Sequence, residues 1–102
     1  MFIILWEYDV AKGREVEFEK IYGANGDWAQ LFKRSRGYLG TDLLRDPSHP
    51  RRYVTIDRWD SSEEFDSFQE NYRTEYETMD ARCNSLTEYE AKIGTGTLIL
   101  ST

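Results

Sequence analysis

The fold is decided by RYVTIDRW (residues 52–59) and by DSSEEF (residues 60–65), which follows it directly. The first segment alternates β-branched or aromatic residues with polar ones, which is typical of a strand whose successive side chains point to opposite faces. The second opens a helix, because Ser61 can cap free backbone N–H groups and Glu64, three residues later, can complete a capping box. Apolar residues then recur three or four positions apart to about residue 82, on one helical face: Phe65, Phe68, Tyr72, Tyr76 and Met79. Such a helix needs a sheet to cover.

The rest of the chain supplies that sheet and a second helical region. The nearly continuous apolar run 2–10 predicts a central strand buried on both faces. The amphipathic segment 14–36 predicts a helix in two pieces, interrupted by glycines within 23–26. Residues 38–46 predict a strand that pairs with 52–59 around a proline-containing turn, and residues 86–93 predict a fourth strand. Glycines at 94–96 are expected to end this strand and leave a short apolar tail, 97–100.

The order strand, helix, strand, strand, helix, strand predicts the α+β class. It corresponds to the ferredoxin-like split βαβ arrangement, an antiparallel sheet with its helices on one face. We expect residues 1–102 to form this single domain. Two helices cover one face only, yet the strands at 2–10 and 52–59 carry apolar residues on both faces. Because a bare second face would expose a large apolar patch, we predict a homodimer in which the sheets of the two subunits pack face to face. The 97–100 tail could also contact the partner subunit.

Composition and charge restrict the partners and the compartment. A net charge of −6 opposes binding to a polyanion, so no nucleic-acid partner is expected. Cys83 is the only cysteine, so no disulfide can form within the chain, which suits a reducing cytoplasm. No basic and apolar leader precedes Phe2, and no apolar run has the length of a membrane span. The expectation is a cytoplasmic protein that does not bind a membrane.

No strong catalytic or metal-binding motif is present. The sequence has no Ser/His/Asp set, no phosphate-binding glycine loop and no CxxC pair. His49 is the only histidine and lies in the turn between two predicted strands, without an accompanying acidic cluster. We therefore expect neither a metal nor another cofactor.

Aromatic residues make up 15% of the chain, and two interpretations of them stay open. They either fill a small core or line a cavity for a flat, mostly apolar ligand. The second interpretation predicts a cavity between helices and sheet, with substrate-binding residues Trp6, Tyr22, Trp28 and Phe68 and further candidates Tyr72 and Trp59.

Two carboxylates interrupt otherwise apolar strands, Glu7 and Asp57. A partly buried carboxylate can have a raised pKa and serve as a base. Alternatively, it pairs with an arginine such as Arg45 or Arg58. Both interpretations stay open at this stage.

The segments YVTIDRW (53–59), DSSEEFDSF (60–68) and GYLGTDLLRD (37–46) resemble the antibiotic biosynthesis monooxygenase family of dimeric α+β barrels. The resemblance implies an obligate dimer with a pocket between helices and sheet in each subunit. Some members oxidise polycyclic phenols with O₂ and without metal or flavin, because the substrate anion itself reduces oxygen. Trp59 matches the tryptophan that ends the third strand of the family. The resemblance therefore suggests Trp59 and Tyr72 as catalytic residues, with Asp57 or Glu7 as the base.

A related branch of similar domains degrades haem with an asparagine, a tryptophan and a histidine. The corresponding positions here hold Glu7, Phe68 and approximately Thr78, so haem degradation is not expected. Two hypotheses remain. The first is a cofactor-independent monooxygenase that oxidises an electron-rich aromatic or polycyclic small molecule with O₂. The second is a non-catalytic, dimeric α+β barrel that binds small molecules or acts in stress.

Overall fold

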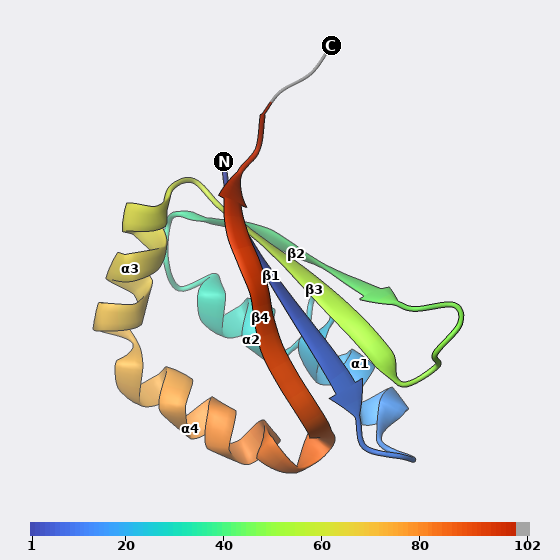
Figure 1. Cartoon of the computed structure of the whole chain (residues 1–102). Helices are drawn as coiled ribbons and strands as arrows, with labels where there is room; N and C mark the ends of the chain where they lie inside the picture. The colour runs from blue at the N-terminus through green and yellow to red at the C-terminus, as the bar shows by residue number, and fades with distance from the viewer. Residues whose placement is uncertain (100–102) are drawn as a thin grey trace.

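The computed structural model describes residues 1–99 of the chain. Its elements are β1 (Phe2–Val10), α1 (Glu15–Tyr22), α2 (Asp27–Phe32), β2 (Tyr38–Arg45), β3 (Arg52–Trp59), α3 (Ser62–Asn71), α4 (Arg73–Cys83), a 3-10 turn η1 (Asn84–Leu86) and β4 (Thr87–Thr97). The strands form one antiparallel sheet in the order β2-β3-β1-β4. All helices lie on one face of this sheet (Figure 1). The predicted α+β, ferredoxin-like fold is confirmed.

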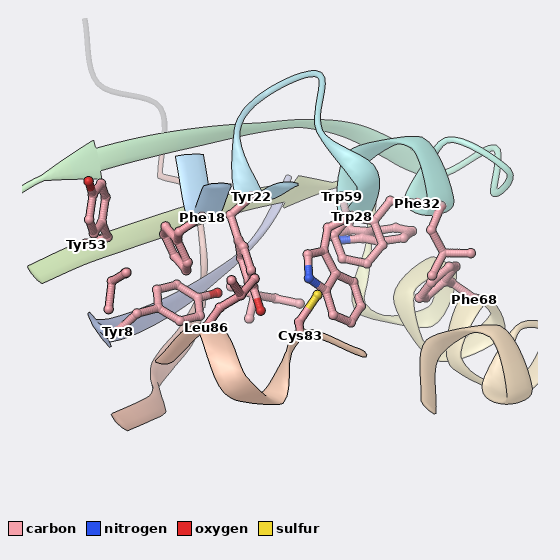
Figure 2. Packing of buried hydrophobic residues seen from close by; sticks show 13 residues of the cluster. Tyr8, Phe18, Tyr22, Trp28, Phe32, Tyr53, Trp59, Phe68, Cys83 and Leu86 are labelled. Atoms are coloured by element: carbon pink, nitrogen blue, oxygen red, sulfur yellow. The ribbon is translucent and has the colours of Figure 1, made fainter. Parts of the chain in front are cut away.

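The first helical region is broken where the glycines predict a break, between α1 and α2. Gly26 makes the tight return possible, because a Cβ atom there would lie 2.3 Å from the carbonyl oxygen of Ile21. No residue with a side chain fits this position without a backbone shift. The break places Tyr22 and Trp28, one on each side of it, over the same region of the sheet (Figure 2).

The second helix is also broken, which the sequence did not predict. Tyr72 has φ −124° and ψ 29° and separates α3 from α4, which point in different directions in Figure 1. Two contacts hold the bend: the Tyr72 ring stacks on Phe68 with 5.5 Å between centroids, and the Tyr72 hydroxyl donates to the Arg34 carbonyl oxygen at 3.3 Å. No glycine or proline marks this position, because tertiary packing produces the bend.

The fourth strand extends to Thr97, beyond the predicted end at residue 93. Gly94 and Gly96 pair with Leu5 and Ile3 of β1 after a register shift, so the glycines continue the strand as an irregular edge. Leu86, the expected first residue of the strand, instead belongs to the 3-10 turn and is buried. Of the predicted tail 97–100, residue 100 lies outside the described residues.

The core between helices and sheet is built mainly from aromatic rings (Figure 2). Trp59 is fully buried at its centre, and its ring lies 5.3–5.7 Å from four other rings, those of Phe32, Tyr38, Phe65 and Phe68. Aromatic pairs at these separations add to the free energy gained by burial. Part of the aromatic excess of the sequence is therefore explained by the core.

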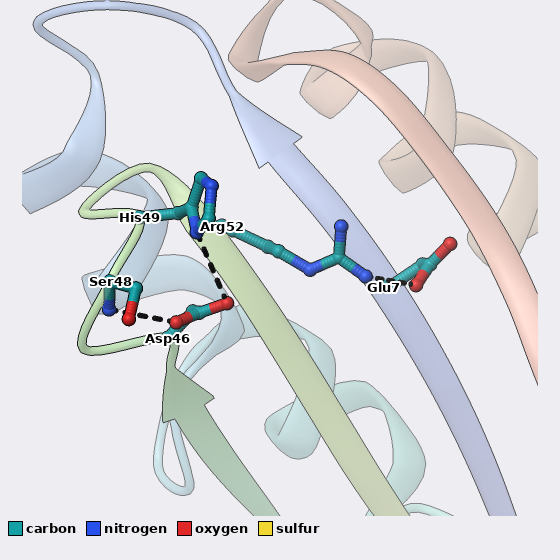
Figure 3. A network of polar contacts seen from close by, with 5 residues as sticks. All are labelled: Glu7, Asp46, Ser48, His49 and Arg52. Atoms are coloured by element: carbon teal, nitrogen blue, oxygen red, sulfur yellow. Dashed lines mark hydrogen bonds and ion pairs between the residues drawn. The ribbon is translucent and has the colours of Figure 1, made fainter.

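The opposite face of the sheet carries no helix (Figure 1). The register places Leu5 opposite Ile56 and Leu44 opposite Val54, all pointing away from the helices. Leu44 is 51% exposed. This face also holds the ion pair between Arg52 Nη2 and Glu7 Oε2, 2.8 Å apart (Figure 3). The residues of the central strands β1 and β3 on the helix-free face are half-buried, or exposed in the case of Arg52, so burial of these strands on both faces stays a prediction. Within residues 1–99, no helix has the length and apolarity needed to cross a membrane.

Candidate active site

A cavity of about 140 Å³ lies between the sheet and the helices. Strands β1, β2 and β3 form its floor, α1, α2 and α4 form its walls, and β4 contributes to its rim. The lining consists of aromatic, small polar and acidic residues: Trp6, Tyr8, Tyr22, Trp28, Ala29, Phe32, Thr41, Thr55, Asp57, Tyr76, Asp80 and Glu90. A mostly apolar cavity with a few convergent polar groups is typical of small-molecule sites.

Asp57 is the buried acid of this cavity, with 8% of its surface exposed. The register of β2 against β3 places Thr41 directly opposite it, and the Thr41 hydroxyl donates to Asp57 Oδ1 at 2.7 Å. The hydroxyls of Tyr38 and Thr41 are 2.6 Å apart. Because Thr41 has only one hydroxyl proton, Tyr38 is the donor in this second bond. The three residues form a chain of hydrogen bonds that ends on the carboxylate.

Burial raises the pKa of Asp57 from 3.8 to about 6, and the hydrogen bond from Thr41 and the charge of Arg58 limit the rise. At neutral pH the carboxylate is therefore mainly ionised and is a stronger base than an exposed aspartate. Groups with shifted pKa values in a cavity are candidates for acid–base chemistry.

A second polar pair lies beside it on β1 and β3. The hydroxyls of Tyr8 and Thr55 are 2.9 Å apart, and both residues are buried. Burial is the main reason that the pKa of Tyr8 lies well above its ordinary value, so this hydroxyl stays protonated. Tyr8 can therefore position a ligand by a hydrogen bond.

The rim of the cavity is acidic. Burial, followed by the charge of Asp80, raises the pKa of Glu90. Burial raises the pKa of Tyr76 to about 12, and the charges of Asp80, Glu90 and Asp57 add to this rise. Asp57, Tyr76, Asp80 and Glu90, from three different elements, thus share one negative environment that extends from the interior of the cavity to its opening.

The structure brings four of the seven predicted site residues together in the lining: Trp6, Tyr22, Trp28 and Asp57. Trp28 Nε1 is buried without a hydrogen-bond partner among the described residues. The other three predicted residues are not part of the lining. Trp59 and Phe68 are fully buried in the core, and the Tyr72 hydroxyl bonds to the Arg34 carbonyl outside the cavity. A catalytic role of Trp59 and Tyr72, and a substrate-binding role of Phe68, stay predictions.

Several lining residues were not predicted from the sequence. Thr41 and Thr55 belong to no sequence motif, but both lie on the same sheet face as Asp57. Thr41 is directly opposite Asp57 on β2, and Thr55 precedes it by two residues on β3. Alternation along β3 could have identified Thr55. Asp80 and Glu90 could not have been found in this way, because their approach depends on the bend between α3 and α4 and on the register of β4.

The arginine pairing considered for Asp57 is not formed. Arg45 Nη1 lies 3.8 Å from Glu19 Oε2, and Arg58 forms its ion pair with Asp42. Glu7, the other candidate base, lies on the helix-free face of the sheet and is paired with Arg52 (Figure 3). Glu7 therefore cannot act in the cavity, and the expectation that it could be the base there is corrected.

His49 lies in the turn between β2 and β3, where its Nδ1 is 3.5 Å from Asp46 Oδ2 (Figure 3). The Ser48 N–H donates to the other carboxylate oxygen of Asp46 at 2.8 Å, so these contacts organise the turn. Among residues 1–99, no group of three or more His, Cys, Asp or Glu side chains is arranged to hold a metal ion. Cys83 is a free, buried thiol at the end of α4.

A family model described as "Antibiotic biosynthesis monooxygenase" matches residues 1–81. The chain belongs to this family. The matched range includes nearly the whole cavity, since all lining residues except Glu90 lie within it. A comparison with curated proteins gives no match.

Solved structures similar to this family member share its fold. SnoaB, a cofactor-independent oxygenase from Streptomyces nogalater, has a TM-score of 0.79 and 20% identity over 98% of this chain and 94% of SnoaB. A candidate antibiotic biosynthesis monooxygenase from Bordetella bronchiseptica has a TM-score of 0.73 and 20% identity over 97% of both chains. A MhuD variant with two manganese protoporphyrin IX molecules in each active site has a TM-score of 0.71 and 22% identity over 100% of this chain and 98% of that chain.

Proposed function

We propose that the protein is a cofactor-independent monooxygenase that oxidises an electron-rich aromatic small molecule with O₂ in the cavity around Asp57. The single observation that carries the proposal is a carboxylate buried in an aromatic cavity and oriented by the Thr41 hydroxyl, and this burial raises its pKa to about 6. Family membership and the similarity to the oxygenase SnoaB support it.

In the proposed reaction, Asp57 accepts a proton from an acidic phenol or from a methylene group activated by aromatic rings. The resulting anion transfers electrons to O₂, and a bond forms between the substrate carbon and oxygen. For a methylene substrate the balance is CH₂ + O₂ → C=O + H₂O, in which the carbon loses four electrons and the two oxygen atoms gain them. The protein orients the substrate and excludes water from the anion.

The size of the cavity restricts how the substrate binds. A cavity of about 150 Å³ with apolar walls holds one benzene molecule, and the cavity here has about 140 Å³. We propose that one aromatic ring of the substrate enters between Trp28 and the floor of the sheet, while larger substituents lie toward Asp80 and Glu90 at the rim.

Haem chemistry is the less favoured alternative. MhuD binds a porphyrin, but cavities for drug-sized ligands are usually about 300–1,000 Å³, larger than the cavity around Asp57. Of the positions implied for haem degradation, Phe68 is in the core and Glu7 is on the helix-free face. Neither reaches the cavity.

We further propose that the protein is a homodimer in which the helix-free sheet faces pack together. The exposed apolar residues on and near this face support it, among them Leu44 and Tyr89, which are 51% and 49% exposed. Each cavity opens on the helix side of its own sheet, so the proposed contact would leave both cavities accessible.

The test is oxygen consumption by protein treated with a metal chelator, in the presence of a panel of hydroquinones and anthrones. We expect uptake above the protein-free rate, and a loss of at least 100-fold in Asp57→Asn, because a positioned base contributes about 10²–10⁴-fold. Asp66→Asn, which alters an exposed acid on α3, is the matched control and should leave the rate unchanged. Absence of uptake over the protein-free rate would contradict the proposal and favour the non-catalytic binding protein.

A further inference from the structure

The charged residues of the cavity lining all have one sign, and two neighbouring cations, Lys92 over the Trp6 ring and Arg58 next to Asp57, lie outside the lining. Three of its lining residues are acidic, Asp57 in the interior and Asp80 and Glu90 at the rim. Of the described residues that line the cavity, none is Lys, Arg or His. Carboxylates that face a shared, partly buried space repel one another. A positively charged ligand group would relieve this repulsion, whereas an anion would increase it.

The interior carboxylate also has an unused acceptor. Thr41 donates to Asp57 Oδ1, and no described residue donates a hydrogen bond to Asp57 Oδ2. The residue is 92% buried, as its 8% exposure implies, and it belongs to the cavity lining. A buried ionised carboxylate is stabilised by a donor on each oxygen. A ligand hydroxyl in the cavity would supply the missing donor, in the position from which Asp57 would accept the proton of a phenol.

The aromatic lining suits the same kind of ligand. Six of the twelve lining residues carry aromatic rings: Trp6, Tyr8, Tyr22, Trp28, Phe32 and Tyr76. Ring faces attract cations, and the attraction grows when the cation is removed from water. The chain itself shows this chemistry, because Lys92 Nζ lies over the Trp6 ring, 5.8 Å from its centroid. One lining ring therefore already holds an ammonium group from outside the lining.

We propose that the ligand of this cavity is an aromatic molecule that carries a positively charged amine. Its ring lies among the aromatic residues with the phenol directed toward Asp57, and its ammonium group lies between Asp80 and Glu90 at the rim. The inference rests on the proposed function, in that it takes the same cavity as the substrate site, and it narrows the substrate class to electron-rich phenols with an ammonium side chain. Anionic aromatic acids of the same size are excluded as good ligands.

The test is a binding titration that follows the tryptophan fluorescence, in which Trp6 and Trp28 of the lining report on the ligand, with three phenols of one skeleton and different charge. Tyramine is cationic, tyrosol is neutral and 4-hydroxyphenylacetate is anionic at about pH 7.5. We expect tyramine to bind at least about 10-fold more tightly than tyrosol, and 4-hydroxyphenylacetate to bind most weakly. Equal affinities, a preference for the anion, or no binding of tyramine would overturn the inference.

Charge variants test whether Asp80 and Glu90 at the rim cause the preference for tyramine over tyrosol. In the double variant Asp80→Asn/Glu90→Gln, the ratio of tyramine to tyrosol affinity should fall to within about threefold while tyrosol affinity is retained. Glu88→Gln is the matched control, because Glu88 precedes Glu90 on β4 but pairs with Arg51 outside the cavity. Retained tyrosol binding shows that a variant is folded. An unchanged ratio in the double variant would contradict the assignment.

The inference and the proposed function fail in different ways. Charge-selective binding without oxygen consumption would leave the inference standing and overturn the monooxygenase. Oxygen consumption with neutral hydroquinones, together with no preference for tyramine, would support the monooxygenase and overturn the inference.

Discussion

The hydroxyl of Thr41 donates to Asp57 Oδ1 at 2.7 Å across the pairing of β2 with β3, and it does so inside the cavity. Two opposing effects determine the pKa of the Asp57 carboxyl group. Burial favours the protonated acid, and the hydrogen bond favours the carboxylate. Burial is the larger effect, so the pKa of Asp57 is raised to about 6.

The first prediction concerns this hydrogen bond. Thr41→Val keeps the shape of the side chain but removes the donor, so the pKa of Asp57 should rise above about 6. A hydrogen bond to a charged group contributes about 1.5–3 kcal/mol, which corresponds to a rise of about one to two pH units. The measurement is an NMR titration of the Asp57 carboxyl carbon. Thr41→Ser, which keeps the hydroxyl, should titrate as the wild type does, and an unchanged midpoint in Thr41→Val would contradict the role of the bond.

The second prediction concerns stability and its dependence on pH. The folded-state pKa of Asp57, about 6, lies above the ordinary 3.8. Its contribution to stability is therefore fully present below about pH 4 and is lost as the pH rises through about 6. Asp57→Asn cannot ionise, so at pH 7.5 it should raise the free energy of unfolding by about 1–3 kcal/mol.

Urea denaturation at pH 7.5 and at pH 4 measures this difference. The gain of Asp57→Asn should be absent at pH 4, where the wild-type carboxyl is already protonated in the folded protein. A gain of the same size at both pH values, or a loss at pH 7.5, would show that ionisation of Asp57 does not lower stability.

The third prediction separates packing from chemistry at Trp59. Its ring is fully buried among four other rings and is not part of the cavity lining. Trp59→Phe should therefore lower the melting temperature, because a large-to-small change in the core leaves unfilled space. If Trp59 acts only through packing, turnover per folded molecule should stay within about twofold of the wild-type value, since Phe32 and not Trp59 belongs to the cavity lining. A strong fall in turnover with an unchanged melting temperature would assign Trp59 to the reaction, as the resemblance suggests.

The fourth prediction concerns the dimer. Ile56→Lys places a charge at the centre of the helix-free face, where Ile56 pairs with Leu5. Sedimentation at micromolar concentration should give a dimer for the wild type and a monomer for this variant. Val16→Lys on α1, at a residue that is 84% exposed, should remain dimeric. A wild-type monomer at this concentration would refute the sheet-to-sheet assembly.

The sequence predicted the fold well because its strongest signals are local. Alternation in 52–59, the Ser61 cap and the glycines near residue 26 each act over a few residues, and each is found where expected. Ser61 indeed accepts a hydrogen bond from the Glu64 N–H. The bend at Tyr72 was missed because its cause is a contact with Arg34, 38 residues away in the chain.

Only part of the candidate site could be predicted, because some of its residues are brought together by tertiary contacts that leave no local pattern in the sequence. Asp57 stood out because a carboxylate in an apolar strand needs an explanation, and Trp6, Tyr22 and Trp28 stood out by their size. Trp59 and Phe68 gave the same signal although they belong to the core, since an aromatic residue at a buried position has the same pattern whether it faces a cavity or another ring. Asp80 looked like one of many solvated helix charges, and only the tertiary arrangement brings it to the rim.

The most direct test of the central claim, that this chain activates O₂ without a cofactor through Asp57, is isotope labelling. Protein treated with a metal chelator is incubated under ¹⁸O₂ with the compound of the panel that is consumed fastest, and the product is analysed by mass spectrometry. The account predicts one ¹⁸O atom per product molecule, formed at least about 100-fold more slowly by Asp57→Asn. A product without ¹⁸O above the protein-free reaction, or an Asp57→Asn variant as fast as the wild type, would contradict it.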